Sequence, residues 1–60
     1  MAENLKVFNV SVLDFEGNLY STIVQADDDF NAKAFGLDDI HESNRFADLN
    51  TDTAEVFEIK

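Results

Sequence analysis

LKVFNVSVLDFEGNLYSTIVQA, residues 5–26, is the stretch that decides the fold of this chain. Two runs of β-branched and apolar residues in near-alternation flank the acidic, glycine-containing segment DFEGN, residues 14–18. Such alternation is typical of half-buried strands. Asp14 is placed to accept hydrogen bonds in the turn, and Gly17 suits the left-handed residue of a three-residue hairpin loop with a bulge. The segment therefore predicts an antiparallel β-hairpin.

The register of this hairpin follows from its turn, and it sorts the side chains onto two faces. One face is mainly apolar and is the better core face: Phe8, Val10, Val12, Tyr20, Thr22 and Val24. The opposite face is mixed, with an apolar rim: Val7, Asn9, Ser11, Leu13, Leu19, Ser21 and Ile23.

Residues 28–43 have the spacing of one helix, with Asp27 as the expected N-cap and acids in the first turn, where the helix dipole favours them. Gly36 costs about 1 kcal/mol relative to alanine in a helix, so we expect a bend or break there. Phe35 lies about 140° around the helix from Phe30, outside the expected buried stripe. That stripe consists of Phe30, Ala34, Leu37 and Ile40.

After the helix, residues 44–53 read as a polar connection pinned by Phe46 and Leu49, and residues 54–59 alternate again as a last strand. We therefore predict a single α+β domain over residues 1–60 with the element order β-β-α-β. Its three-stranded antiparallel sheet has the order 2-1-3, and one helix packs on one face. No second helix is available to cover the other face.

Size and charge narrow the classes of function. A domain of 60 residues buries only about 60% of the surface of its unfolded chain, so it depends on good packing or on self-association. The chain has no Cys and one His, which excludes disulfides and thiolate or His-rich metal sites. Thirteen acids face four bases, for a net charge of −9. Direct binding to nucleic acid requires clustered basic side chains, whereas the four basic residues of this chain are scattered along the sequence. They are Lys6, Lys33, Arg45 and Lys60.

The chain has few residues suited to catalysis. His41 is the one side chain with an ordinary pKa near neutrality, and the helix spacing places it at the boundary of the buried stripe. Two isolated glycines do not make a phosphate-binding loop. We also expect little room for a pocket of the usual ~300 Å³ or more. The sequence therefore predicts a protein that is not an enzyme and has no cofactor.

One segment resembles a calcium loop in part. Asp48, Asn50 and Asp52 stand at alternate positions, as the first ligands of such a loop do. Thr53 then stands where the turn needs Gly, and Ile59 where a bidentate Glu is needed. We predict no metal site and a solvated loop with Asx turns, with weak divalent-cation binding as the alternative.

The acids form clusters, and two interpretations are open. The first is solubility and helix capping. The second is a surface that binds a basic protein, in which spaced carboxylates imitate nucleic-acid phosphates and Phe35 serves as an apolar anchor. The residues of this candidate partner-binding surface are Asp28, Asp29, Phe35, Asp38, Asp39, Glu42 and Asp48.

Apolar side chains on the uncovered sheet face also require an explanation. Either the connection with Phe46 and Leu49 folds over them, or a second copy of the chain covers them in a symmetric dimer through the sheet face or an edge strand. The residues concerned are Val7, Leu13, Leu19 and Ile23.

In layout the chain resembles small acidic early proteins of bacteriophages, in particular the small dimeric phage inhibitors of uracil-DNA glycosylase. The shared features are a hairpin with an acidic Gly turn (LDFEGNLY), a helix with acids and Phe (DDDFNAKAFG) and a closing strand (AEVFEIK). The resemblance implies a dimer that imitates DNA and uses an aromatic side chain from each subunit, surrounded by acids. Phe35 beside Asp38 and Asp39 is the nearest match.

Together these patterns predict a non-enzymatic acidic protein-binding module, a phage-type inhibitor that binds a basic host protein surface as a nucleic-acid mimic. We expect it in the cytoplasm, of a host cell if a phage encodes it, with no membrane partner. The alternative is a structural or assembly accessory protein that self-associates and has no host target.

Overall fold

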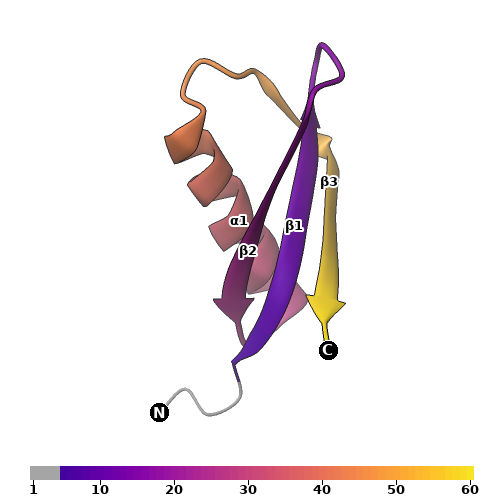
Figure 1. Ribbon diagram of the computed structural model, residues 1–60, viewed down its shortest axis with the longest axis vertical. Coiled ribbons are helices and arrows are strands. Elements are labelled where there is room, and N and C mark those ends of the chain that lie inside the picture. Colours follow the sequence, from indigo (N-terminus) through magenta and orange to yellow (C-terminus); the bar gives the residue numbers. More distant parts are fainter. Residues whose placement is uncertain (1–4) are drawn as a thin grey trace.

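The computed structural model describes residues 5–60, which form one three-stranded sheet and one helix (Figure 1). The strands are β1 (Lys6–Asp14), β2 (Leu19–Ala26) and β3 (Leu49–Ile59), and the helix is α1 (Asp29–Ser43). Both strand pairs are antiparallel and the order is β2-β1-β3, so β2 and β3 are the edges. The predicted β-β-α-β fold and its strand order are confirmed.

The hairpin has the register that its turn predicts. Val12 pairs with Tyr20 and Val10 with Thr22, and Gly17 adopts a φ of 91°, in the left-handed region that favours glycine. The predicted core face is also confirmed, because β1 turns its buried side chains toward the helix. The buried hydrophobic residues are Phe8, Val10, Val12, Ala26, Ala32 and Ile40.

The helix buries a different stripe from the one its hydrophobic spacing predicts. Ala32, Gly36 and Ile40, each four residues apart, face the sheet. Of the predicted stripe only Ile40 is fully buried, whereas Phe30 is 78% exposed and Ala34 is exposed. Two of the three residues at the contact, Ala32 and Gly36, are small.

Gly36 explains this preference. A Cβ atom at this position would lie 2.4 Å from the Cβ of Val10, well inside any normal contact distance. The helix backbone therefore rests almost directly on the Val10 side chain. The expected break at Gly36 is wrong: α1 runs through it without interruption, since the glycine permits a close approach and does not end the helix.

The helix begins one residue later than predicted. Its N-cap is Asp28, whose Oδ1 accepts a hydrogen bond from the Asn31 amide at 2.8 Å. Asp27 instead accepts from the side-chain amide of Asn31 at 2.8 Å, and this bond holds the pKa of the Asp27 carboxyl below its usual value. Two of the three consecutive aspartates thus have local structural roles.

Strand β3 begins at Leu49, so the predicted polar connection over residues 44–53 is too long. The first half of β3 pairs with the end of β1, and the register of this pairing shifts between Ser11 and Leu13 of β1. There the Leu13 amide donates to the Thr53 hydroxyl at 2.9 Å. Phe46 is fully exposed and does not pin the connection, contrary to expectation.

No residue that the structure describes covers the second face of the sheet. The large apolar side chains of this sheet face are mostly more than half exposed, which shows that the connection after the helix does not fold over the face. The exposed ones are Leu19, Ile23, Phe57 and Ile59.

The close approach of helix and sheet leads to a first prediction. Helix propensity favours Ala over Gly by about 1 kcal/mol, so an ordinary Gly36→Ala change would stabilise the protein. Because the new methyl group would overlap Val10, we expect a net loss of roughly 1–2 kcal/mol in the free energy of unfolding. Urea unfolding measures it, and Ala34→Gly at an exposed position calibrates the propensity difference in this helix. A Gly36→Ala protein more stable than the wild type would contradict the close packing.

Candidate functional site

One flank of α1 gathers an aromatic side chain and three acids. At about 100° per residue, Phe35, Asp38, Asp39 and Glu42 all project to the same side of the buried Ala32–Gly36–Ile40 stripe. That side faces β2, because the Thr22 hydroxyl on β2 donates a hydrogen bond to Asp39 Oδ2. We call these four residues the acidic flank.

Phe35 is 52% exposed within the acidic flank. The helix lies too close to the sheet at Gly36 for a ring to enter between them, so Phe35 projects from the side. The structure therefore places it where the sequence predicts, outside the core and next to Asp38 and Asp39.

The remaining predicted residues lie elsewhere. Asp28 and Asp29 stand at the first turn, about 20 Å along the helix from Glu42. They line a shallow depression of about 280 Å³ that also includes Lys6 and Glu58. Asp48 lies beyond the last turn of the helix and lines another hollow together with Glu42. The seven predicted residues therefore fall into the cluster of four on the helix flank, a pair at the helix start, and Asp48, which shares a hollow with Glu42.

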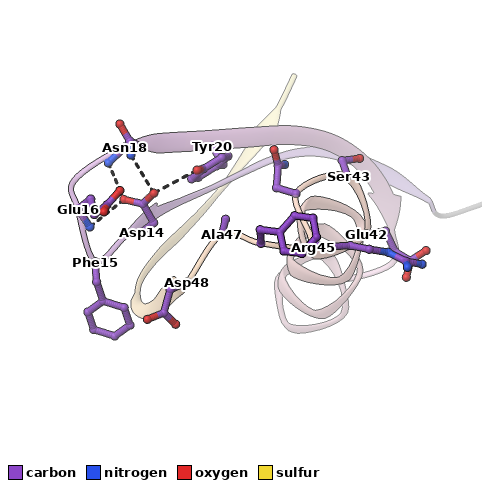
Figure 2. Close-up of a pocket in the computed structure, with 12 residues that line it drawn as sticks. Asp14, Phe15, Glu16, Asn18, Tyr20, Glu42, Ser43, Arg45, Ala47 and Asp48 are labelled. Carbon is purple, nitrogen blue, oxygen red and sulfur yellow. Dashed lines mark hydrogen bonds between the residues drawn. The ribbon is translucent and has the colours of Figure 1, made fainter.

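The larger hollow is an open groove of about 850 Å³ between the hairpin turn and the segment that follows the helix (Figure 2). The prediction that so short a chain has little room for a pocket is wrong, since both segments project past the sheet. The charged residues of its lining are four acids and one base, Arg45. The titratable and aromatic lining residues are Asp14, Phe15, Glu16, Tyr20, Glu42, Arg45, Phe46 and Asp48.

At the inner wall of the groove, Asp14 is held by four donors. Its Oδ1 accepts from the backbone amides of Glu16 at 2.9 Å and Asn18 at 2.8 Å. Its Oδ2 accepts from the Asn18 side-chain amide at 2.9 Å and from the Tyr20 hydroxyl at 3.1 Å (Figure 2). The bond from the Asn18 side chain is the main reason that the pKa of Asp14 lies below its ordinary value. The same carboxylate raises the pKa of Tyr20.

This network commits Asp14 to the turn. A carboxylate with both oxygens occupied is a structural acceptor and is not free for a ligand. The side chains of the groove that remain free for contact are therefore those on its rim. Phe15 and Phe46 are 66% and 103% exposed, and Figure 2 shows the Phe15 ring turned away from Asp14.

The two rim aromatics were not among the predicted site residues. Phe15 occupies the second position of the turn, where its side chain cannot reach the core, and this signal was readable from the hairpin prediction. Phe46 gave no such signal, because a lone Phe in a polar connection usually packs inward. His41, predicted at the boundary of the buried stripe, is exposed instead.

Residues 5–60 contain neither a metal-binding cluster of side chains nor a membrane-spanning helix. No group of three or more His, Cys, Asp or Glu side chains in this range is arranged to hold a metal ion. Asn50 and Asp52 lie in β3, where the Asn50 side chain accepts from the Asp52 amide at 3.3 Å. Within the same range, no helix has the length and apolar character needed to cross a bilayer.

Comparison of the chain with models of protein families, with curated proteins and with solved structures finds no match in any of the three. The resemblance to phage glycosylase inhibitors therefore stays a prediction. The geometry itself provides an acidic flank with one exposed aromatic ring, an open groove with two more, and an uncovered sheet face.

The bonds to Asp14 predict how stability depends on pH. Its pKa is lower in the folded chain than the ordinary 3.8, so its ionised form stabilises the fold at neutral pH. That contribution is lost as the pH falls below ~4 and through the lowered pKa. We expect Asp14→Asn to be less stable than the wild type at pH 7 and to lose less stability on acidification.

Urea unfolding at a series of pH values measures both effects. Asp38→Asn is the matched control, because it removes the same charge from an exposed helix position. If Asp14→Asn and Asp38→Asn show the same stability at every pH, the Asp14 network does not stabilise the turn.

Proposed function

We propose that this protein is a non-enzymatic acidic module that binds a basic protein surface through the acidic flank. The observation that carries the proposal is the half-exposed Phe35 ring between carboxylates on one side of α1. Aromatic side chains are enriched among the residues that dominate binding energy in interfaces. Surrounding charge adds specificity and speeds association with a partner of opposite sign.

The distribution of structural roles among the acids supports this choice. Asp14, Asp27 and Asp28 accept hydrogen bonds within the chain, so their charges serve the turn and the helix start, and Asp39 accepts one from Thr22 on β2. Asp38 and Glu42 are exposed on the middle and last turns of the helix, away from the N-terminal end that favours acids. Their position does not help the helix, and a basic partner would give them a role.

A narrower form of the proposal is a nucleic-acid mimic that inhibits its target. The net charge of −9 and the grouping of carboxylates beside an aromatic ring support it, as in the phage inhibitors that the chain resembles. In this form, the partner is a nucleic-acid-binding protein of a phage-infected cell. Its complex with this protein would then be displaced by added DNA or RNA.

Self-association is the second candidate function, and a different observation favours it. The uncovered sheet face carries Ile23, Phe57 and Ile59, each about half exposed, in a chain whose own core is small. A structural or assembly protein would hide these side chains against a second copy.

The first proposal predicts the effect of charge reversal. Protein immobilised on resin retains its partners from a bacterial lysate, and mass spectrometry quantifies them. We expect Asp38→Lys/Glu42→Lys to reduce recovery of the specific partner by about tenfold or more, since it turns attraction into repulsion. Phe35→Ala should reduce it by a similar factor through loss of the anchor.

Asp52→Lys/Glu58→Lys on β3 is the control, because it changes the net charge by the same amount at the sheet edge opposite β2. Its partner recovery should stay near that of the wild type. Equal losses for both double variants would mean that only net charge attracts the retained proteins, and the acidic flank would have no specific role. Release of the partner by added DNA distinguishes the mimic from a plain basic-surface binder.

The second candidate predicts a concentration-dependent dimer. Sedimentation equilibrium of the wild type should then show a mass above that of one chain, and Ile23→Lys/Phe57→Lys should return it to the monomer. A wild type that sediments as a monomer up to high concentration excludes the assembly function.

A further inference from the structure

The two edges of the sheet differ in how they are protected. Strand β3 carries Asp52, Glu55 and Glu58 and has an irregular register, which are usual ways of blocking an edge against further strands. Strand β2, with the sequence LYSTIVQA, has no charge, no proline and no bulge along eight residues. In a chain of which 28% of residues are charged, this uncharged edge stands out as open to strand pairing.

The hydrogen-bond pattern shows which backbone groups of β2 are free. The Asp14 amide donates to the Asn18 carbonyl, and antiparallel pairs alternate along the strands from there. Tyr20, Thr22 and Val24 therefore exchange bonds with β1. The residues between them direct their N–H and C=O groups outward, and all are exposed: Leu19, Ser21, Ile23 and Gln25.

The residues of the acidic flank lie level with successive residues of β2. The Thr22 hydroxyl binds Asp39, and Tyr20 shares the groove lining with Glu42. Phe35 lies one turn further back along α1, toward Val24. One helix turn rises 5.4 Å and two strand residues span about 6.7 Å, so the two series stay nearly level over this length.

We propose that β2 is the docking edge for an extended basic segment of the partner, which adds to the sheet as a fourth strand. The segment has Lys or Arg level with Tyr20 and Thr22, where Glu42 and Asp39 lie, and an apolar residue level with Val24, where Phe35 lies. Apolar residues at the intervening positions contact Leu19 and Ile23 on the uncovered face. Main-chain bonds supply affinity and the alternating side chains supply specificity.

Charge decides between this occupant and a second copy of the chain. Pairing β2 with β2 of another copy would bring two acidic flanks together across the new strand pair. With a net charge of −9 on each chain, that arrangement is opposed electrostatically, whereas a basic segment neutralises the flank. The inference rests on the proposed function, because it assigns a conformation to the basic partner.

The direct test uses the wild-type protein and a synthetic peptide of the same length as β2, eight residues, with alternating lysine and valine. Amide hydrogen exchange is followed by NMR with and without the peptide. We expect protection of the outward amides of Leu19, Ser21, Ile23 and Gln25 on peptide binding. The outward amide of Glu58 on β3 should not change.

Two control peptides separate charge from strand pairing. Alternating glutamate and valine should not bind, since its charge matches that of the flank. Four lysines followed by four valines has the composition of the probe without its alternation, and it should bind at least several-fold more weakly. Equal binding of both basic peptides without protection of the β2 amides would overturn strand addition.

A variant provides the second test. Ser21→Pro removes one outward N–H and places a ring on the edge, a position where sheets tolerate proline, and we expect about a tenfold loss of peptide affinity. Glu58→Pro makes the equivalent change on the edge of β3 and should bind as the wild type does. Circular dichroism and urea unfolding verify that both variants fold.

The outcomes also separate this inference from the proposed function. If Asp38→Lys/Glu42→Lys abolishes peptide binding and Ser21→Pro does not, the acidic flank binds basic partners without strand addition, and only the inference fails. If neither change matters, both fail. Protection of the β2 edge without peptide, rising with protein concentration, would show that a second copy occupies it and would overturn the inference.

Discussion

The contact between Gly36 and Val10 is the constraint on which the rest of the structure depends. The helix approaches the sheet until there is no room for a Cβ atom, so only Ala32, Gly36 and Ile40 face the strands. A contact this close has no space for large rings. Of six phenylalanines in the chain, only Phe8 is buried, and the other five are each more than half exposed. The protein thus forms a small core mainly from Val and Ala, together with Phe8 and Ile40, and keeps its other five phenylalanine rings largely in contact with water.

What the sequence could predict follows from the range of the interactions involved. The hairpin was predictable to the residue, because Asp14 and Gly17 set the turn by local hydrogen bonds and backbone conformation. The buried helix stripe was not, since α1 offers two stripes of helical spacing and hydrophobicity favours the one with Phe30 and Leu37. The sheet selected the other by steric fit, which depends on Val10 from a distant part of the chain. The start of β3 was missed for a similar reason, because polar residues after Leu49 read as a loop until β1 supplies a pairing partner.

The candidate site was predictable in part. The sequence placed Phe35 beside Asp38, Asp39 and Glu42 because residues three and four apart share a helix face, and the structure keeps them together. It grouped Asp28, Asp29 and Asp48 with them on charge alone, and charge carries no information about position. Charge also did not reveal which acids are already engaged. Asp28 caps the helix and Asp14 holds the turn, and both assignments depend on hydrogen-bond geometry that only a folded chain defines.

The fold keeps the possible contact surfaces apart, and this separation bears on how the two candidate functions relate. The acidic flank lies on the helix side of the sheet, whereas Phe57 and Ile59 lie on the opposite side, paired with Asn9 and Val7 of β1. That opposite side is nearly uncharged, with Glu55 as the one acid opposite the central strand. Two copies joined through it would point their helices away from each other, so their acids would add little repulsion at the contact. Each copy would then present its acidic flank outward. Self-association and binding to a basic partner are therefore compatible, and a dimer of this kind would bind a partner with two basic segments more tightly than one copy does.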